Sequence, residues 1–273
     1  MIARCFRMGR YLRLVFAFAL SSKSGDLGIA ARLSVGIRVL RVFLRLRQES
    51  ATTFPEQLLL LSSILSLDPD APGHVAEFGC YKGASSVVLS IAAKKTGRKL
   101  LVFDSFEGLP EPTETVRNVT TGNVLDYRKG MYSGSLMHVR GNIERLGEIA
   151  AVEFVKGFYS DTLPQRPADE RYAFIFEDAD LVSSVKDVLI HSWPRLNPGG
   201  LFFSHEALDL EVCALFFDAE FWQTHHQCPP PGLVGVGAGL PLNRGGFPDT
   251  RMCPIPGHYG SCLAYVFKTL SPP

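Results

Sequence analysis

The stretch LVFDSFEGLPEPTE, from Leu101 to Glu114, places an acidic residue at the end of an apolar run and follows it with turn-forming residues. The run that ends at Asp104 is continuously apolar, as is typical of a strand buried on both faces of a parallel sheet. Gly108 and two prolines then turn and stiffen the chain, because glycine tolerates unusual backbone angles and proline fixes φ. The stretch therefore predicts a central strand that carries a carboxylate at its open end.

Strand and helix patterns alternate on both sides of this stretch. Strands are expected at residues 74–79, 99–106, 152–157, 172–178, 201–207 and 262–270, and helices at 84–95, 135–147, 183–196 and 209–223. The segment NPGG at 197–200 is expected to be a turn. Strands that alternate with helices across short connections predict an α/β, doubly wound, Rossmann-like fold with a mostly parallel sheet.

The chain divides into a basic beginning and an acidic remainder. It has 273 residues, of which 46% are hydrophobic, with a formal net charge of +1. Residues 1–50 hold ten Lys or Arg and two Asp or Glu, a charge of +8, and the rest carries −7. We expect a helical N-terminal arm over residues 1–54 and one domain over 55–273. The overall balance gives no reason to expect a nucleic-acid partner.

The arm has two interpretations. Helical spacing of apolar residues is found at 28–48 and again at 55–67, with arginines interspersed in the first segment. A basic amphipathic helix on an anionic membrane surface is one interpretation. We favour the other, in which the arm packs on the domain or on a second subunit. No apolar run reaches the roughly 18–20 residues needed to span a bilayer.

The cysteines favour a reducing compartment. Six are present, at positions 5, 80, 213, 228, 253 and 262, and no C-x-x-C pair occurs among them. Most lie within apolar runs, which indicates buried thiols rather than a disulfide framework. The group His225, His226 and Cys228 matches no standard metal-site spacing. We therefore predict a cytoplasmic protein.

The end of the first strand carries a candidate cofactor-binding turn. In EFGCYKGASS, Gly79 and Gly83 let the backbone turn tightly and approach a ligand closely. Glu77 precedes the turn, and Ser85 and Ser86 open a helix whose free N–H groups would face that ligand. The spacing is G-x-x-x-G rather than the G-x-G-x-x-G of dinucleotide enzymes, which argues against a nicotinamide dehydrogenase.

Asp104 follows Glu77 by 27 positions, at the end of the second strand. An acidic residue at that place can accept hydrogen bonds from two ribose hydroxyls. A solvated aspartate that caps the loop is the alternative. Together with the glycine turn, the acid favours a nucleoside ligand. Phe106 either lines an adenine pocket or packs in the core.

Two further strand ends carry clustered ligand atoms. EDAD ends the strand at 172–178 with Asp178 and Asp180, and SHEA follows the next with His205 and Glu206. Carboxylates that gather without a cation repel one another, so a divalent cation such as Mg²⁺ is physically motivated. The imidazole would also admit Mn²⁺, Fe²⁺ or Zn²⁺. The alternative is that these are only polar strand ends.

Several of these motifs resemble those of a known family. VAEFGCYKGASS, FDSFEGLPEP, SGSLMHVRGNI, VKGFYSDTLP and DADLVSSVKDVL, in unbroken order over about residues 70–208, are similar to the macrocin O-methyltransferase family. The resemblance implies a seven-stranded, mostly parallel sheet, S-adenosylmethionine (SAM) as cofactor, and metal-assisted methylation of a hydroxyl on a sugar or other natural-product molecule. It also implies a homo-oligomer.

The resemblance assigns roles to individual residues. The implied cofactor-binding residues are Glu77, Gly79, Tyr81, Gly83, Ser85, Ser86, Asp104, Ser105, Phe106, Gly157 and Asp178. Asp180 would be the general base, and Asp178, His205 and Glu206 the metal ligands. The family has two adjacent aspartates where this chain has His205 and Glu206.

That departure leaves three possibilities open: weaker Mg²⁺ binding, a softer metal, or loss of the metal. The alternative functions are a catalytically altered SAM-binding homologue and a cephalosporin-hydroxylase-like relative with non-haem iron. Whatever the reaction, we expect the substrate to be walled by the N-terminal arm and by a lid-like loop at 229–260.

Overall fold

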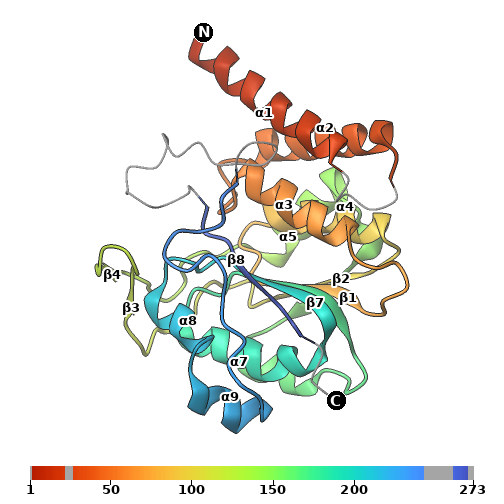
Figure 1. Cartoon of the computed structure of the whole chain (residues 1–273). Coiled ribbons are helices and arrows are strands. Elements are labelled where there is room, and N and C mark those ends of the chain that lie inside the picture. Colours follow the sequence, from red (N-terminus) through yellow and green to blue (C-terminus); the bar gives the residue numbers. More distant parts are fainter. Residues whose placement is uncertain (1, 22–26, 243–260, 270–273) are drawn as a thin grey trace.

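The computed structural model describes residues 2–21, 27–242 and 261–269 (Figure 1). Its main sheet has the strand order β5-β2-β1-β6-β7-β8. The strands are β1 (His74–Phe78), β2 (Leu100–Asp104), β5 (Val152–Lys156), β6 (Tyr172–Glu177), β7 (Leu196–Ser204) and β8 (Ala264–Phe267). All neighbours pair in parallel except β7 and β8, which are antiparallel. The doubly wound, mostly parallel fold is confirmed.

The described residues supply six strands of this sheet, whereas seven were expected. Residues 243–260, within the expected lid-like loop, lie outside the described part of the chain. The strand order reverses between β1 and β6, because the chain runs outward from β1 on one side and from β6 on the other. In open α/β sheets, ligands bind at the carboxyl ends of the strands near such a reversal.

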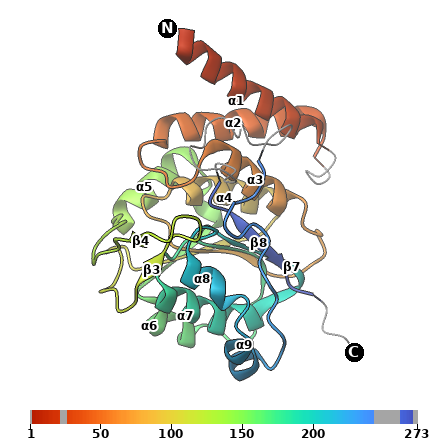
Figure 2. The same ribbon diagram turned by 60° about the vertical axis from the view of Figure 1, so that its left-hand side comes forward.

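Helices cover both faces of the sheet, as Figures 1 and 2 show. One face packs against α3 (Phe54–Leu65), α4 (Ala84–Lys95) and α5 (Leu136–Leu146), and α2 (Ile29–Leu46) lies over α3 and α4. The other packs against α7 (Val182–Ser192), α8 (Leu210–Leu215) and α9 (Ala219–His226), with the short α6 (Tyr159–Thr162) beside them. Every residue of β2 and β6 is buried, which explains their continuous apolar runs.

The two N-terminal helices pack on the domain. Helix α1 (Ile2–Leu20) lies on α2, and its Tyr11 ring contacts Phe54 of α3 with 5.3 Å between ring centroids. Arg38 of α2 pairs with Glu148 at 2.5 Å. Of the two interpretations of the arm, packing on the domain is therefore the one realised within this chain. The boundary at residue 54 stays a prediction, as does any contact with a second subunit or a membrane.

Gly36 explains how closely α1 and α2 approach each other. A Cβ atom at this position of α2 would lie 3.0 Å from Val15 and 3.2 Å from Phe18 of α1. Glycine is unfavourable in a helix interior, so a packing reason for its presence is expected. Among the described helices, none is long and apolar enough to cross a membrane.

Two predicted helix boundaries were wrong. The helix expected at 209–223 is divided into α8 and α9, because Asp218 caps a new helix by accepting a hydrogen bond from the Phe221 N–H at 3.0 Å. The helix expected at 183–196 ends at Ser192, since Pro194 follows and the chain continues as a 3₁₀ turn over Trp193–Arg195. Strand β7 then begins at Leu196 and includes the NPGG segment that was expected to be a turn.

An unpredicted hairpin lies between β2 and α5. Strands β3 (Val116–Arg117) and β4 (Val124–Leu125) pair in an antiparallel manner. The Asn118 side chain accepts hydrogen bonds from the backbone N–H groups of Thr120 and Thr121, both at 3.0 Å, and so holds the connecting turn. Short 3₁₀ helices at Ile149–Ala151 and Leu163–Gln165 complete the described secondary structure.

Candidate active site

A cavity of about 580 Å³ opens at the carboxyl ends of β1, β2, β6 and β7. Nine of the residues predicted from the sequence line it, namely Gly79, Tyr81, Asp104, Ser105, Gly157, Asp178, Asp180, His205 and Glu206. The other five predicted residues, Glu77, Gly83, Ser85, Ser86 and Phe106, are not among those that line it. Residues separated by more than 100 positions in the sequence thus meet at one place.

Gly79 brings the first turn against the end of β6. Its φ is 86°, and a Cβ atom there would lie 1.9 Å from the backbone oxygen of Asp178. No side chain fits at that distance, so only glycine allows this approach. The Asp178 N–H also donates a hydrogen bond to the Phe78 carbonyl at 2.8 Å. The predicted cofactor-binding turn and the acidic segment are therefore fixed to each other through backbone contacts.

Glu77 lies beneath this turn as a completely buried carboxyl group. Neither of its oxygens has a hydrogen-bond partner among the described residues. Burial raises the pKa of Glu77 to about 8, although Ser85 and Ser86 at the start of α4 act in the opposite direction. A buried carboxyl group without a partner is suited to receive a cationic or hydrogen-bond-donating group of a ligand.

Asp104 is held at the tip of β2 by two backbone groups. The Cys80 N–H donates to its Oδ2 at 2.8 Å, and the Phe106 N–H donates to its Oδ1 at 2.6 Å. Burial raises the pKa of Asp104, and these two hydrogen bonds limit the rise. Each oxygen keeps a second lone pair, so the carboxylate can still accept from a ligand in the cavity.

The side chain of Phe106 lies in the core. It is almost fully buried and packs edge-on against Phe154 of β5, with 6.1 Å between ring centroids. Gly157 lies next to the end of β2, where its N–H donates to the Asp104 carbonyl at 3.0 Å. Ser105 supports the following loop by donating from its hydroxyl to the Gly108 carbonyl at 2.8 Å.

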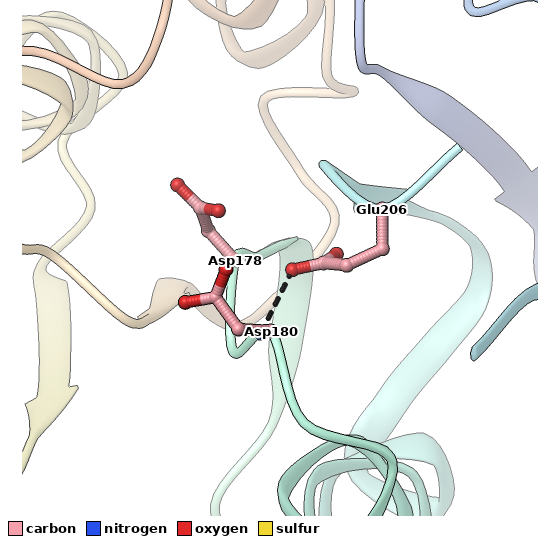
Figure 3. A group of neighbouring side chains, drawn as sticks. All are labelled: Asp178, Asp180 and Glu206. Carbon is pink, nitrogen blue, oxygen red and sulfur yellow. Dashed lines mark hydrogen bonds between the residues drawn. The ribbon is translucent and has the colours of Figure 1, made fainter. Parts of the chain in front are cut away.

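The acidic residues of two neighbouring strand ends form a close group. Asp178, Asp180 and Glu206 each offer a carboxylate oxygen, and these atoms all lie within 4.8 Å of one another. Figure 3 shows Glu206 pointing toward Asp180, whose backbone N–H donates to Glu206 Oε1 at 3.1 Å. Asp180 itself has a φ of 61°, an unusual conformation for a residue other than glycine, and such strain often marks functional sites.

Burial and mutual repulsion shape the charge of this group. The pKa values of Asp180 and Glu206 are raised well above their usual range, first by burial and then by neighbouring carboxylates. Burial also raises the pKa of Glu177 to about 7 and that of Asp209 to about 6. A bound cation would relieve these repulsions, so the donor set fits a divalent metal with oxygen ligands.

His205 lies at the side of the acidic group and is not part of it. Its Nδ1 is 3.2 Å from Asp178 Oδ1, and its Nε2 is 3.6 Å from Glu56 Oε1. Burial alone would lower the pKa of His205, but the two carboxylates raise it well above the usual value. Glu56 was not predicted as a site residue. The pattern T-x-x-E at 53–56 signals a helix start and not a contact with the site.

An aromatic wall of the cavity was also missed. The rings of Tyr81, Tyr132 and Tyr127 follow one another edge to face, with 6.0 and 6.5 Å between centroids. The Tyr127 hydroxyl donates to Asp209 Oδ2 at 2.7 Å, at the start of α8. The segment that carries two of these tyrosines has no strand or helix periodicity, so nothing in the sequence connects it with the cavity.

The N-terminal arm and the loop at 229–260 were expected to wall the substrate, and the cavity agrees with this only in part. Ala51 and Cys262 line the cavity, but none of the described residues 229–242 does, and 243–260 lie outside the described part of the chain. The segment between β2 and α5 forms a wall instead. It is fixed to α7 by Glu114, which accepts from the Ser183 N–H at 2.6 Å, and to α8 by the Arg117–Glu211 ion pair at 2.6 Å.

The fold and the site define a doubly wound α/β protein with an acidic group beside the glycine turn that follows β1. The chain belongs to the macrocin-O-methyltransferase (TylF) family, whose family model matches residues 63–230. That match covers more than half of the chain and includes the turn at 79–83, Asp104 and the acidic group.

Individual relatives agree with this assignment. Over 133 residues the chain is 38% identical to 8-demethyl-8-(2,3-dimethoxy-alpha-L-rhamnosyl)-tetracenomycin-C 4'-O-methyltransferase of Streptomyces olivaceus, covering 47% of this chain and 51% of the relative. It is 33% identical over 141 residues to mycinamicin III 3''-O-methyltransferase of Micromonospora griseorubida, covering 50% and 55%. The chain thus spans about half the length of the curated relatives it matches.

A solved structure supports the fold over a greater length. The O-methyltransferase NovP superposes with a TM-score of 0.57 at 18% sequence identity, covering 96% of this chain and 99% of that one. At this identity the similarity bears on the fold alone.

Proposed function

We propose that the protein is a SAM-dependent O-methyltransferase that acts on a hydroxyl group of a sugar or other natural-product molecule, assisted by a divalent cation. The observation that carries the proposal is a single cavity that joins the glycine turn and Asp104 on one side to the Asp178, Asp180 and Glu206 group on the other. A methyl donor and a coordinated hydroxyl need this proximity, because positioning of the two reactants supplies much of the catalysis.

The cofactor half is proposed from the unpartnered and polar groups around the first turn. Glu77 would accept from the ammonium group at the methionine end of SAM, next to the turn formed by Gly79, Tyr81 and Gly83. The first turn of α4, with Ser85 and Ser86, provides N–H groups and polar side chains. SAM, when bound, supplies a methyl group on a positively charged sulfur.

The nucleoside half is proposed from the end of β2. Asp104 would accept from the ribose hydroxyls, with Ser105 beside it on the cavity wall. Gly157 would lie near the adenine. Phe106 would support the end of β2 by packing in the core, since its ring contacts Phe154.

The acidic group is the proposed metal-binding part of the site. Asp178 and Glu206 would hold the cation from neighbouring strand ends, and His205, the third predicted ligand, contacts Asp178. A divalent cation, when bound, lowers the pKa of a coordinated hydroxyl group and fixes its orientation. Asp180 would accept the hydroxyl proton. Burial and neighbouring carboxylates raise its pKa, which makes it a stronger base than a free aspartate.

The acceptor is proposed to bind against the tyrosine wall. Aromatic faces with nearby carboxylates suit the C–H faces and hydroxyl groups of a sugar, and Tyr127, Tyr132 and Asp209 provide both. The names of two relatives, a rhamnosyl-tetracenomycin 4'-O-methyltransferase and a mycinamicin III 3''-O-methyltransferase, support a glycosidic acceptor for this chain.

Asp178→Asn tests the proposed function. The substitution keeps the shape of the side chain but removes a charge from the cation site, so we expect methyl transfer to fall by at least about a hundredfold. Binding of S-adenosylhomocysteine, measured by calorimetry, should stay within about threefold. Transfer is measured from labelled SAM to a panel of glycosides, with Mg²⁺, with Mn²⁺ and with a chelator. Undiminished turnover of the variant would sink the metal assignment.

A second candidate function is a catalytically altered homologue that still binds SAM. The observation that favours it is the contact of His205 with Asp178, because an imidazole there occupies one side of a carboxylate that the metal would need. Calorimetric binding of SAM without transfer to any acceptor in the panel would favour this candidate. Iron-dependent oxidation without SAM binding would favour the cephalosporin-hydroxylase-like alternative.

We also propose a cytoplasmic homo-oligomer. The apolar side chains of Leu12, Phe16 and Leu20 on α1 are exposed within the described chain, which gives a second copy a surface to cover. Light scattering coupled to gel filtration measures the mass, and a monomer at micromolar concentration would contradict this proposal.

A further inference from the structure

Glu56 of α3 is a buried carboxylate that reaches the site from the N-terminal side of the chain. Its exposed fraction is 1%. Its Oε2 accepts from the Thr53 N–H at 2.7 Å and from the Thr53 hydroxyl at 2.8 Å, forming a capping box. Its Oε1 accepts from the Cys262 N–H at 2.8 Å and lies 3.6 Å from His205 Nε2.

Helix capping alone does not explain this arrangement. A capping box needs only one oxygen of the glutamate and is usually formed at the protein surface, where water serves the other. Here the second oxygen is also buried, and burying a carboxylate is unfavourable unless donors or a positive charge compensate. The Cys262 N–H compensates this second oxygen in part, and the His205 imidazole at 3.6 Å is the other group that it faces.

His205 has a carboxylate on each side of its ring. Nδ1 faces Asp178 at 3.2 Å, Nε2 faces Glu56 at 3.6 Å, and the ring meets Phe176 at a steep angle with 6.1 Å between centroids. The Nδ1 contact with Asp178, the ion-pair distance between Nε2 and Glu56, and the Phe176 ring together restrict the rotation of the imidazole. A fixed imidazole in turn fixes the Asp178 carboxylate that it contacts, which leaves Asp178 aimed at the acidic group.

We propose that Glu56 is a positioning residue, which holds His205 so that Nδ1 orients the Asp178 carboxylate. His205 then acts behind Asp178 instead of binding the metal directly, since both of its nitrogens are directed at carboxylates. This inference rests on the proposed function, because it assumes that the acidic group binds the metal. Partners behind a metal ligand typically change metal affinity by about 10- to 100-fold when they are removed.

The test compares Glu56→Gln with Thr53→Ala. Both variants disturb the capping box, but Thr53→Ala leaves the Glu56 carboxylate and His205 in place. We expect Glu56→Gln to weaken Mn²⁺ binding, followed by electron paramagnetic resonance with Mn²⁺ alone, by about tenfold or more. Thr53→Ala should keep the wild-type Mn²⁺ affinity. Both should bind S-adenosylhomocysteine within about twofold of wild type, because the cofactor half is not involved.

A second readout does not depend on the metal. The ring-nitrogen resonances of His205, assigned by their loss in His205→Asn, should shift in Glu56→Gln and stay in place in Thr53→Ala. If the wild type binds no Mn²⁺, the metal part of the proposed function fails, and these resonances still decide the role of Glu56. If Glu56→Gln does not fold, Glu56→Asp is measured, and the same resonances should shift because the shorter side chain withdraws from Nε2.

A double-mutant cycle completes the test. In the His205→Asn background, Glu56→Gln should cause no further loss of Mn²⁺ affinity, since Glu56 acts through the imidazole. Unshifted His205 resonances in Glu56→Gln, an equal loss of Mn²⁺ affinity in Thr53→Ala, or additive losses in the double variant would each overturn the proposal.

Discussion

Two completely buried glutamates in this protein have pKa values that move in opposite directions. Burial raises the pKa of Glu77 to about 8, although the side chains of Ser85 and Ser86 act in the opposite direction. Burial acts on Glu56 in the same sense, but His205, with the N–H groups of Thr53 and Cys262, outweighs it and lowers that pKa to about 2. The difference follows from the neighbours and not from the depth of burial.

Relative to wild type, the ligand-free Glu77→Gln variant should be more stable at pH 8 than it is at pH 5. The folded-state pKa of about 8 lies above the usual 4.5, so the stability contribution of Glu77 is complete below about pH 4.5 and is lost as the pH rises toward 8. Glutamine cannot ionise and avoids this loss. We expect the variant to gain on the order of 2–4 kcal/mol at pH 8 relative to pH 5, measured by urea unfolding.

The same substitution should weaken S-adenosylhomocysteine binding, because a neutral amide replaces the carboxylate proposed to accept from the ammonium group. Equal stability differences between variant and wild type at pH 5 and pH 8 would contradict the raised pKa of Glu77.

Tyr127→Phe should affect the acceptor more than the chemistry. The hydroxyl of Tyr127 donates to Asp209 on the cavity wall. Loss of one such hydrogen bond typically costs about 1 kcal/mol, so the KM for the acceptor should rise roughly fivefold while kcat stays within twofold. Steady-state kinetics with a saturating methyl donor measure both values. A fall in kcat without a change in KM would place Tyr127 in the chemical step instead.

The secondary-structure elements were predicted with unequal success. Strands such as β2 and β6 were recognised because burial on both faces requires continuous apolar runs. The hairpin of β3 and β4 was missed because two-residue strands are too short to show an alternating pattern. The break between α8 and α9 was missed because the apolar residues Phe216 and Phe217 continue the helical spacing across it.

Gly36 and Gly141 form a matched pair for testing the packing of α1 on α2. Both are interior helix glycines, but a Cβ at Gly36 meets Val15 at 3.0 Å, whereas nothing lies within 4 Å of a Cβ at Gly141. Gly36→Leu should therefore destabilise the protein by about 1–3 kcal/mol through overpacking. Gly141→Leu should be neutral or stabilise by up to about 1 kcal/mol through helix propensity.

Thermal unfolding of the two variants and the wild type measures the difference. If both substitutions stabilise the protein equally, α1 does not pack on α2 in solution.

Charge in the folded molecule is distributed less evenly than the net value of +1 indicates. Seven carboxylates line the cavity, and no Lys or Arg is found among the described residues that line it. Basic residues such as Arg13, Arg41 and Arg45 lie on α1 and α2, beyond α3 and α4 as seen from the sheet. The cavity is thus a negative region within a nearly neutral protein.

An uncharged glycoside should therefore be a better acceptor than the same sugar carried on a nucleoside diphosphate. Negative groups in a cleft repel an anionic ligand and favour neutral or cationic ones. We expect kcat/KM for the neutral glycoside to be at least about tenfold higher, with the difference narrowing at high salt. If the protein prefers the nucleotide sugar at low salt, the carboxylates that line the cavity do not determine which acceptor is selected.

Site residues that directly follow a strand could be predicted from the sequence, whereas those on a helix or in a loop could not. Asp104, Asp178 and Glu206 stand directly after strands, and the carboxyl ends of parallel strands meet at one edge of the sheet, so their proximity could be inferred. Glu56 and Tyr127 come from a helix and a loop whose tertiary positions the local sequence does not encode. Their contacts depend on how α3 and the segment after β2 pack against the sheet.

The contact between Gly79 and the Asp178 carbonyl has a consequence for how this protein can be diversified. Because a Cβ at position 79 would lie 1.9 Å from that oxygen, the donor side and the acid side form one interlocked unit. The tyrosine-bearing segment, by contrast, is fastened by side chains such as Glu114 and Arg117. In directed evolution, new acceptor preferences should arise from exchanges in that segment, while position 79 should tolerate almost no replacement.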